Sequence, residues 1–206
     1  MIPVWPFVAV TLPLVLSPGV STAVVLRNSV MGGVKAGLQT AAGANAGSLC
    51  YGLLSAAGMS LALHRWPSAW LALRVGGSAY IAWLGIQSLR RGFGRGLRPT
   101  TLAAATDDPR GIAPLYEGFI TNALNPAIAT FYLVIVPGFV PRGAPVARSI
   151  LILTTIHVLM AGSWHVTWAT AGGALAPVLA RPGPRQLLDS AAGITLIALA
   201  LKIARS

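Results

Sequence analysis

Long apolar stretches separated by short charged segments make up most of this chain, and proline interrupts two of the stretches. The first stretch, Leu12–Leu26, contains Ser17-Pro18-Gly19, and the second, Gly118–Pro141, contains Asn122-Ala123-Leu124-Asn125-Pro126. Proline removes a backbone N–H and clashes with the preceding turn, so each stretch is predicted to form a broken helix. Opened backbone is tolerated at membrane depth only where it is buried in protein or lines a cavity. Two broken helices at corresponding positions of two halves are typical of a transporter's binding site.

Uncharged windows divide the chain into six candidate membrane spans. They are Met1–Leu26, Ala36–Leu63, Trp66–Leu89, Gly118–Pro141, Ser149–Ala180 and Gln186–Ile203. A helix needs roughly 20 residues to cross a bilayer core of about 30 Å, so these windows predict an all-α integral membrane protein. A short loop is expected over Arg27–Lys35, and Gly172–Pro184 is predicted to be loop or interfacial. Residues 1–206 are predicted to form a single transmembrane domain.

The polar segment of residues 90–117 separates a first half (residues 1–89) from a second half (residues 118–206) and is predicted to be a flexible loop. Three spans per half is an odd number, so similar halves would lie in opposite orientations, as a 3+3 inverted repeat with helices 1 and 4 broken. The distribution of lysine and arginine between the loops predicts that residues 90–117 are cytoplasmic and that both termini lie outside.

Composition supports a membrane location, and the positions of the basic residues decide how the net positive charge is interpreted. Of the 206 residues, 55% are hydrophobic and only 9% are charged, against about 25% charged in a soluble domain. The net charge of +11 does not indicate nucleic acid, because the basic residues lie at the ends of apolar runs, where membrane lipids are the expected neighbours. The single cysteine, Cys50, has no metal-ligand spacing around it, so neither a metal nor another cofactor is predicted. A homo-oligomer is compatible with this sequence.

Glycine-, proline- and asparagine-containing motifs follow one another in a specific order. They are Ser17-Pro18-Gly19, Gly37 to Gly47, Gly77-Ser78-Ala79-Tyr80-Ile81-Ala82-Trp83-Leu84-Gly85-Ile86 with Leu89-Arg90, Gly118-Phe119-Ile120-Thr121-Asn122-Ala123-Leu124-Asn125-Pro126, and Val136-Pro137-Gly138-Phe139. In this order and spacing the chain resembles the LysE/RhtB family of bacterial amino-acid exporters over almost its whole length. The resemblance implies a small multi-pass exporter in the bacterial inner membrane, driven by an ion gradient, with protons as the expected coupling ion.

Three positions depart from the pattern of that family. The usual Pro-Gly-Pro ends in Val20 here, the usual Asn-Pro-Lys ends in Ala127, and an acidic residue often found after the second-span glycine is Ser48. Two charged groups expected near the pathway are therefore absent, which bears on the substrate and the coupling ion.

The candidate substrate-binding residues lie at the two breaks and at two further polar positions in the spans. They are Ser17, Pro18, Gly19, Asn45, Arg74, Asn122, Asn125 and Pro126. At the breaks, Pro18 and Gly19 either free carbonyls that face a cavity or only kink a packed helix.

The second break offers two asparagine amides, three residues apart on one helix face, and Pro126 is expected to free the carbonyl of Asn122. That face can bind a substrate's ammonium and carboxylate, or it can serve helix–helix hydrogen bonding. Asn45 faces away from the Gly43/Gly47 packing pair and can reach the pathway.

Five titratable residues have alternative interpretations. Arg74 can hold a substrate carboxylate or can extend its guanidinium to the outer interface. His157 and His165, on roughly one face of the fifth span, are candidates for proton coupling because imidazole titrates near neutral pH, or they are packed core residues. Glu117 and Asp189 are expected at cytoplasmic helix starts, where acids complement the helix dipole, and either can be a cytoplasmic gate or a proton entry point.

The sequence therefore predicts an efflux transporter of a small zwitterionic amino acid or related metabolite, working by alternating access. A passive channel or a non-transporting membrane subunit is the main alternative. A membrane enzyme is disfavoured, because no nucleophile with a base and no ligand cluster falls at membrane depth.

Overall fold

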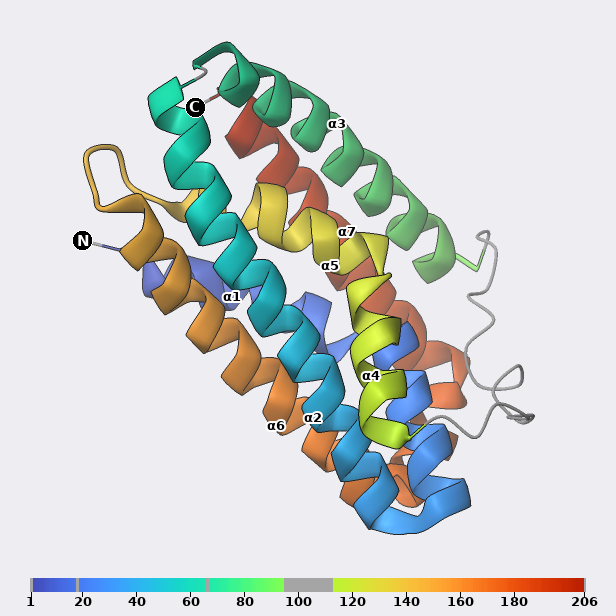
Figure 1. Cartoon of the computed structure of the whole chain (residues 1–206). Helices are drawn as coiled ribbons and strands as arrows, with labels where there is room; N and C mark the ends of the chain where they lie inside the picture. The colour runs from blue at the N-terminus through green and yellow to red at the C-terminus, as the bar shows by residue number, and fades with distance from the viewer. Residues whose placement is uncertain (1, 18, 66, 95–112, 206) are drawn as a thin grey trace.

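The computed structural model describes residues 2–17, 19–65, 67–94 and 113–205. Helices account for nearly all of these residues, and no strand occurs in the described ranges, so the all-α prediction is confirmed there. In chain order the elements are α1 (Val4–Leu16), α2 (Val20–Arg65), α3 (Pro67–Gly92), α4 (Pro114–Ala123), α5 (Pro126–Thr130), the π-helical turn η1 (Phe131–Ile135), the 3-10 turn η2 (Pro137–Phe139), α6 (Val146–Ala180) and α7 (Pro182–Arg205) (Figure 1).

The first predicted break separates α1 from α2. Helix α1 ends at Leu16, Ser17 has an extended backbone with ψ of 117°, and α2 begins at Val20. The two helices are bent relative to each other by 50°. The prediction of a helix broken within Ser17–Gly19 is confirmed, and Pro18 itself lies outside the described residues.

A sharp turn inside α2 replaces the loop expected over Arg27–Lys35. The helix continues through these residues except at Gly33, whose φ of 77° and ψ of 174° are accessible almost only to glycine. Figure 1 shows the chain reversing direction at this point. The expected loop is therefore wrong, because one glycine is enough to make the connection.

The second predicted break separates α4 from α5 and is also confirmed. Helix α4 ends at Ala123, and α5 begins at Pro126 with Asn125 as its N-cap. The segments on either side of the break are bent by 56°. Proline suits the first helical position, where its missing N–H leaves no bond unmade.

The segment between the halves is shorter than the predicted loop of residues 90–117. Helix α3 extends to Gly92, and α4 begins at Pro114. The remainder of that prediction falls on residues 95–112, which lie outside the described ranges.

The connection between the last two helices is also shorter than expected. The predicted loop or interfacial segment over Gly172–Pro184 is helical apart from Arg181, because α6 runs to Ala180 and α7 begins at Pro182. Proline again occupies a first helical position, so the sequence signal for a loop is instead a signal for a helix start.

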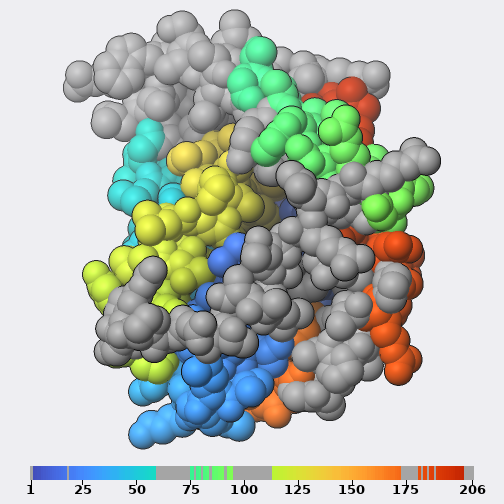
Figure 2. All heavy atoms as spheres, turned by 90° about the vertical axis from the view of Figure 1, so that its right-hand side faces the viewer, coloured from blue at the N-terminus to red at the C-terminus, as the bar shows by residue number. Residues whose placement is uncertain are grey.

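Helix α2 lies at the centre of one group of helices, and α3 pairs with α7. Helix α2 packs against α4 and α6, whereas α1 contacts α6 and α7 and so lies between the two groups (Figure 1). Figure 2 shows the early part of α2, in blue, between α4 in yellow-green and α7 in orange. The main buried core joins these elements through large apolar side chains, namely Phe7, Ile81, Phe131, Tyr132, Ile135, Val136, Phe139, Ile150, Leu153, Leu196 and Leu199.

Helices α2 and α4 approach each other through glycine. A Cβ atom at Gly43 would lie 1.9 Å from the carbonyl oxygen of Leu115, and one at Gly118 would lie 2.1 Å from the carbonyl oxygen of Thr40. A Cβ at Gly47 would lie 2.9 Å from Oδ1 of Asn122. The two helix backbones are therefore in direct contact, as the Gly43/Gly47 pair predicts.

Apolar length is sufficient for membrane crossing in several described segments. Val146–Gly172 is long and apolar enough to cross a membrane alone. Two bent pairs qualify when each pair is taken as one span, namely Val4–Leu16 with Val20–Gly58 and Pro114–Ala123 with Pro126–Phe139. The count of six spans and the inverted repeat stay predictions.

Candidate functional site

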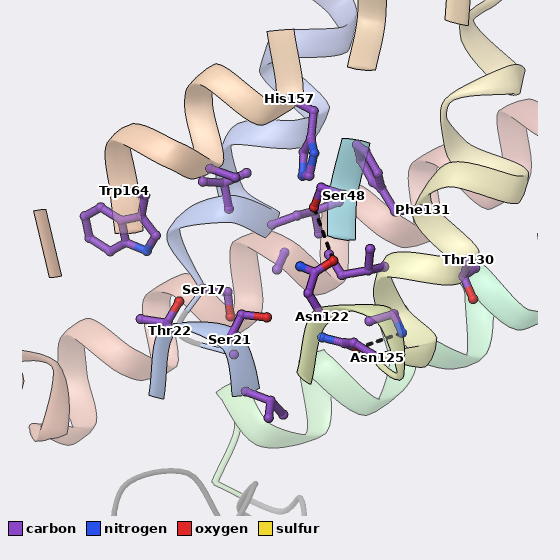
Figure 3. A pocket seen from close by; sticks show the side chains of 18 of the residues that line it. Ser17, Ser21, Thr22, Ser48, Asn122, Asn125, Thr130, Phe131, His157 and Trp164 are labelled. Carbon is purple, nitrogen blue, oxygen red and sulfur yellow. Dashed lines mark hydrogen bonds between the residues drawn. The ribbon is translucent and has the colours of Figure 1, made fainter. Parts of the chain in front are cut away.

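A cavity of about 420 Å³ lies where the two helix breaks meet (Figure 3). Residues from both predicted halves line it, and its polar lining consists of Ser17, Ser21, Thr22, Ser48, Ser88, Asn122, Asn125, Thr130, His157, Trp164, His165 and Asp189. No lysine or arginine is among the described residues that line it. The groups available to a ligand are thus hydroxyls, amides, imidazoles, an indole and one carboxyl.

Asn122 and Asn125 lie on the two sides of the second break and line the same cavity (Figure 3). Asn122 is only 2% exposed, and its Oδ1 accepts a hydrogen bond from Ser48 Oγ at 3.4 Å. Asn125 Oδ1 accepts the N–H of Ala127 at 3.0 Å and so caps α5. The expectation that both amides share one helix face is wrong, because the break falls between them.

Two carbonyls beside this break accept hydrogen bonds within the protein. The carbonyl of Asn122 accepts the N–H of Asn125 at 3.1 Å, so the expectation that Pro126 leaves this carbonyl free is wrong. The next carbonyl, that of Ala123, accepts the hydroxyl of Tyr51 at 2.7 Å. Pro126 is exposed and is not among the lining residues. The carbonyls of Asn122 and Ala123 are therefore engaged within the protein, and the second break brings the side chains of Asn122 and Asn125 to the cavity.

The first break brings the start of α2 to the cavity. Ser17 and Gly19 line the cavity together with Val20, Ser21 and Thr22, the first residues of α2. The first hydrogen bond of this helix joins the N–H of Ala23 to the carbonyl of Gly19 at 3.0 Å. The N–H groups before Ala23 therefore have no partner within the helix.

Both histidines of α6 line the cavity, and both are buried, at 4% exposed for His157 and 7% for His165. The hydroxyl of Tyr132 and Nδ1 of His157 are 2.7 Å apart, and the ring of Phe131 packs against the same imidazole. Nδ1 of His165 is buried and has no hydrogen-bond partner among the described residues. The structure thus brings the two candidate coupling residues to one cavity, and their role stays a prediction.

Two further candidates are not placed at the cavity. Asn45 is not among its lining residues and instead packs against α6, where a Cβ at Gly162 would lie 3.1 Å from Asn45 Nδ2. Arg74 belongs to α3, but its side chain lies outside the part of the chain that the structure describes.

Asp189 is a lining residue that the sequence did not assign to the site. It is 7% exposed and lies in the cavity wall, and its backbone carbonyl accepts the hydroxyl of Ser88 at 2.9 Å. The sequence indicated a position near a helix start, but α7 begins earlier, at Pro182, and carries Asp189 further into the helix. Ser21, Thr22 and Trp164 were also missed, because isolated hydroxyls and tryptophans in apolar runs carry no signal of which way they face.

A polar network connects α2 with the first turn of α4. The guanidinium of Arg27 forms an ion pair with Glu117, and these side chains are 13% and 19% exposed. Asn28 Nδ2 donates to Glu117 Oε2 and to Thr40 Oγ1, each at 2.8 Å. Glu117 does lie in the first turn of a helix, as expected, and this network gives it a second function as a cross-link between helices.

The described residues offer no set of metal ligands. No group of three or more His, Cys, Asp or Glu side chains is positioned there to hold a metal ion. The cavity supplies hydrogen-bonding groups and one carboxyl to a ligand, and this suits a small polar organic molecule.

Comparisons with known proteins agree with this architecture. The family model of the LysE type translocator matches residues 12–206, so the chain belongs to that family. It is therefore a membrane transporter and not an enzyme.

Several curated relatives match most of the chain. A protein named "Putative amino-acid transporter YggA" from Aeromonas salmonicida is 29% identical over 74% of this chain and 68% of its own length. The uncharacterized membrane protein YrhP of Bacillus subtilis is 23% identical over 78% of each chain. An uncharacterized membrane protein of Pseudomonas aeruginosa is 29% identical over 76% of this chain and 73% of its own. No solved structure matches.

Proposed function

We propose that this protein exports a small amino acid or a related zwitterionic metabolite across the bacterial inner membrane by alternating access. The observation that carries the proposal is the cavity at the meeting point of two broken helices, lined by polar side chains that include one carboxyl. Breaks of this kind hold substrate in other secondary transporters, because their polar backbone is tolerated only beside a cavity. The relative named as an amino-acid transporter supports the substrate class.

The proposed binding residues are the side chains at the breaks. Asn122 offers an amide beside Ser48, and Ser17 and Asn125 face the same cavity. Asp189 places a carboxyl in the wall of the same cavity, and we propose that it lies near the substrate's ammonium group. Hydrogen-bond donors and acceptors surround one small cavity, and this combination matches a zwitterion better than an inorganic ion.

Proton coupling is assigned to the histidines of α6. An imidazole changes charge near neutral pH, and both rings border the cavity. His165 is the better placed of the two to take up a proton, because its Nδ1 is not engaged by another described residue, whereas His157 Nδ1 is held by Tyr132.

The proposed arrangement in the membrane follows from the charge of the loops. Both termini lie outside, residues 90–117 lie in the cytoplasm, and the two halves form an inverted repeat whose first helices are the broken ones. Opposite orientation of the two halves is what allows one cavity to face each side of the membrane in turn.

Counterflow in proteoliposomes tests the proposal. Vesicles loaded with one unlabelled amino acid at a time are given the same compound in labelled form, with and without an imposed proton gradient. Saturable exchange of at least one amino acid, with net flux driven by the gradient, is the expected result. Linear, non-saturating flux indicates a channel, and no flux with any compound contradicts transport of amino acids.

A further inference from the structure

Hydrogen-bond donors without acceptors gather on one side of the cavity. Ser21 is 8% exposed, and its hydroxyl has no partner among the described residues. The indole Nε1 of Trp164 is buried and is likewise without a partner in the described ranges. Both residues line the cavity. An indole N–H can only donate, so a molecule bound here can satisfy this group with an acceptor.

Backbone donors lie in the same place. Val20, Ser21 and Thr22 open α2 ahead of its first helical hydrogen bond, which is donated by Ala23. Their N–H groups carry the positive end of the helix dipole, and this helical segment continues to Gly33, which is long enough for a developed dipole. Trp164 packs against the buried cluster that includes Val25 and Leu26 of this segment, and it lines the same cavity as the helix start.

The side-chain amide of Asn122 lies in the same region of the cavity and also directs its nitrogen toward it. Figure 3 shows Ser21 directing its hydroxyl toward Asn122, whose amide nitrogen faces the side on which Ser17 and Ser21 lie. The Oδ1 of Asn122 is already occupied by Ser48. The Asn122 amide nitrogen and the Ser21 hydroxyl can therefore both donate to a molecule in this part of the cavity.

We infer that the start of α2, with Ser21 and Trp164, binds the carboxylate of the transported molecule through uncharged donors. This inference deepens the proposed function by naming the part of the site that selects for an acid group. A carboxylate accepts hydrogen bonds only, and it can use all these donors at once. Because no described lining residue is lysine or arginine, the anion is recognised by dipoles, as at other helix N-termini.

Competition in the counterflow assay tests the inference. The exchanged amino acid is competed with itself, with its primary amide and with the corresponding amine, so that only the carboxylate changes. The wild-type protein should require at least about 30-fold more amide than acid for half-inhibition. Ser21→Ala and Trp164→Phe should each raise the half-inhibiting concentration of the acid about tenfold, or about 1.4 kcal/mol, and leave that of the amide nearly unchanged.

Matched controls separate this loss from general damage. Ser163→Ala removes an exposed hydroxyl on α6 that donates to the Leu159 carbonyl, and Trp5→Phe changes an 82% exposed indole. Neither residue lines the cavity, so both variants should keep the wild-type ratio of amide to acid. Equal effects of Ser21→Ala on acid and amide, or an amide that competes as well as the acid, would overturn the inference while leaving amino-acid transport intact.

A binding measurement gives an answer even if no amino acid is exchanged. Thermal unfolding of the purified protein in detergent is followed against acetate and acetamide at constant ionic strength. Saturable stabilisation by acetate alone, lost in Ser21→Ala and Trp164→Phe, supports a carboxylate site whatever the transported molecule is. Equal responses to acetate and acetamide in the wild-type protein would refute it.

Discussion

Replacing Gly43 by alanine tests the contact between α2 and α4, on which the position of Asn122 depends. The new Cβ would lie 1.9 Å from the carbonyl oxygen of Leu115 and 2.8 Å from the amide nitrogen of Phe119. Ordinary van der Waals contact begins at 3.4 Å. Since both neighbours are backbone atoms, the two helices must move apart to make room.

The expected loss of stability in Gly43→Ala is estimated by comparison with Gly58→Ala. A Cβ at Gly58 meets nothing within 4 Å, so that variant only gains the helix propensity of alanine, about 1 kcal/mol. Gly43→Ala gains the same propensity but adds overpacking, which costs about 1–3 kcal/mol. The overlap with backbone favours the upper end, so the two variants should differ by about 3 kcal/mol, or about 6–12 °C in Tm for a chain of this size.

Thermal unfolding in detergent, monitored by tryptophan fluorescence, measures this difference directly. Gly118→Ala, which would place its Cβ 2.1 Å from the carbonyl oxygen of Thr40, should behave like Gly43→Ala. The double variant should lose less than the sum of the two, because both changes separate the same pair of helices. If Gly43→Ala unfolds at the same temperature as Gly58→Ala, the close contact of α2 and α4 is refuted.

Three further substitutions have defined outcomes. Glu117→Gln should lower the free energy of unfolding by about 1–3 kcal/mol, because it breaks a largely buried ion pair with Arg27, and unfolding in detergent measures the loss. Tyr51→Phe should cost about 1 kcal/mol or more in the same assay, because it leaves the carbonyl of Ala123 at the helix break without its donor. His165→Asn should reduce the ratio of gradient-driven to gradient-free flux in proteoliposomes toward one, because asparagine does not take up a proton.

Each of these has an outcome that counts against it. Unchanged stability of Glu117→Gln would mean that the polar network does not hold α4 against α2. Wild-type stability of Tyr51→Phe would show that the break is satisfied in another way. A full response of His165→Asn to the proton gradient would remove that residue from coupling and leave His157 and Asp189 as the groups to test.

The helix breaks and the close helix contacts could be predicted from the sequence, because proline and glycine act locally. Pro126 starts α5 whatever the tertiary position of that helix. The Gly43/Gly47 spacing indicates a helix face without bulky side chains, but it does not identify the helix that packs against it. The same locality explains the errors. The residues around Gly33 predict a loop, but one glycine with positive φ turns the chain, and the Pro182 region predicts a loop although this proline starts α7.

The binding residues could be predicted only in part, because cavity lining depends on which helix faces which. Asn122 was found since it adjoins a break, whereas Asn45, equally polar, packs against Gly162 of α6. Ser21 and Trp164 lie in apolar runs, and no spacing in the sequence identifies them as residues that line the cavity. Only the structure identifies them as candidate binding residues, because the hydroxyl of Ser21 and the indole N–H of Trp164 are buried without a described partner.

The most direct test of the account is counterflow of amino acids by the wild-type protein and by Asn122→Ala, reconstituted side by side. Asn122 is buried at the cavity beside the break, and Gln39→Ala, which removes an exposed amide outside the cavity, serves as the control. We expect saturable exchange by the wild-type protein and by Gln39→Ala, and a loss of at least about tenfold in Asn122→Ala, as for a hydrogen bond to a charged group. Exchange that is unaffected by Asn122→Ala would show that substrate does not pass through this cavity.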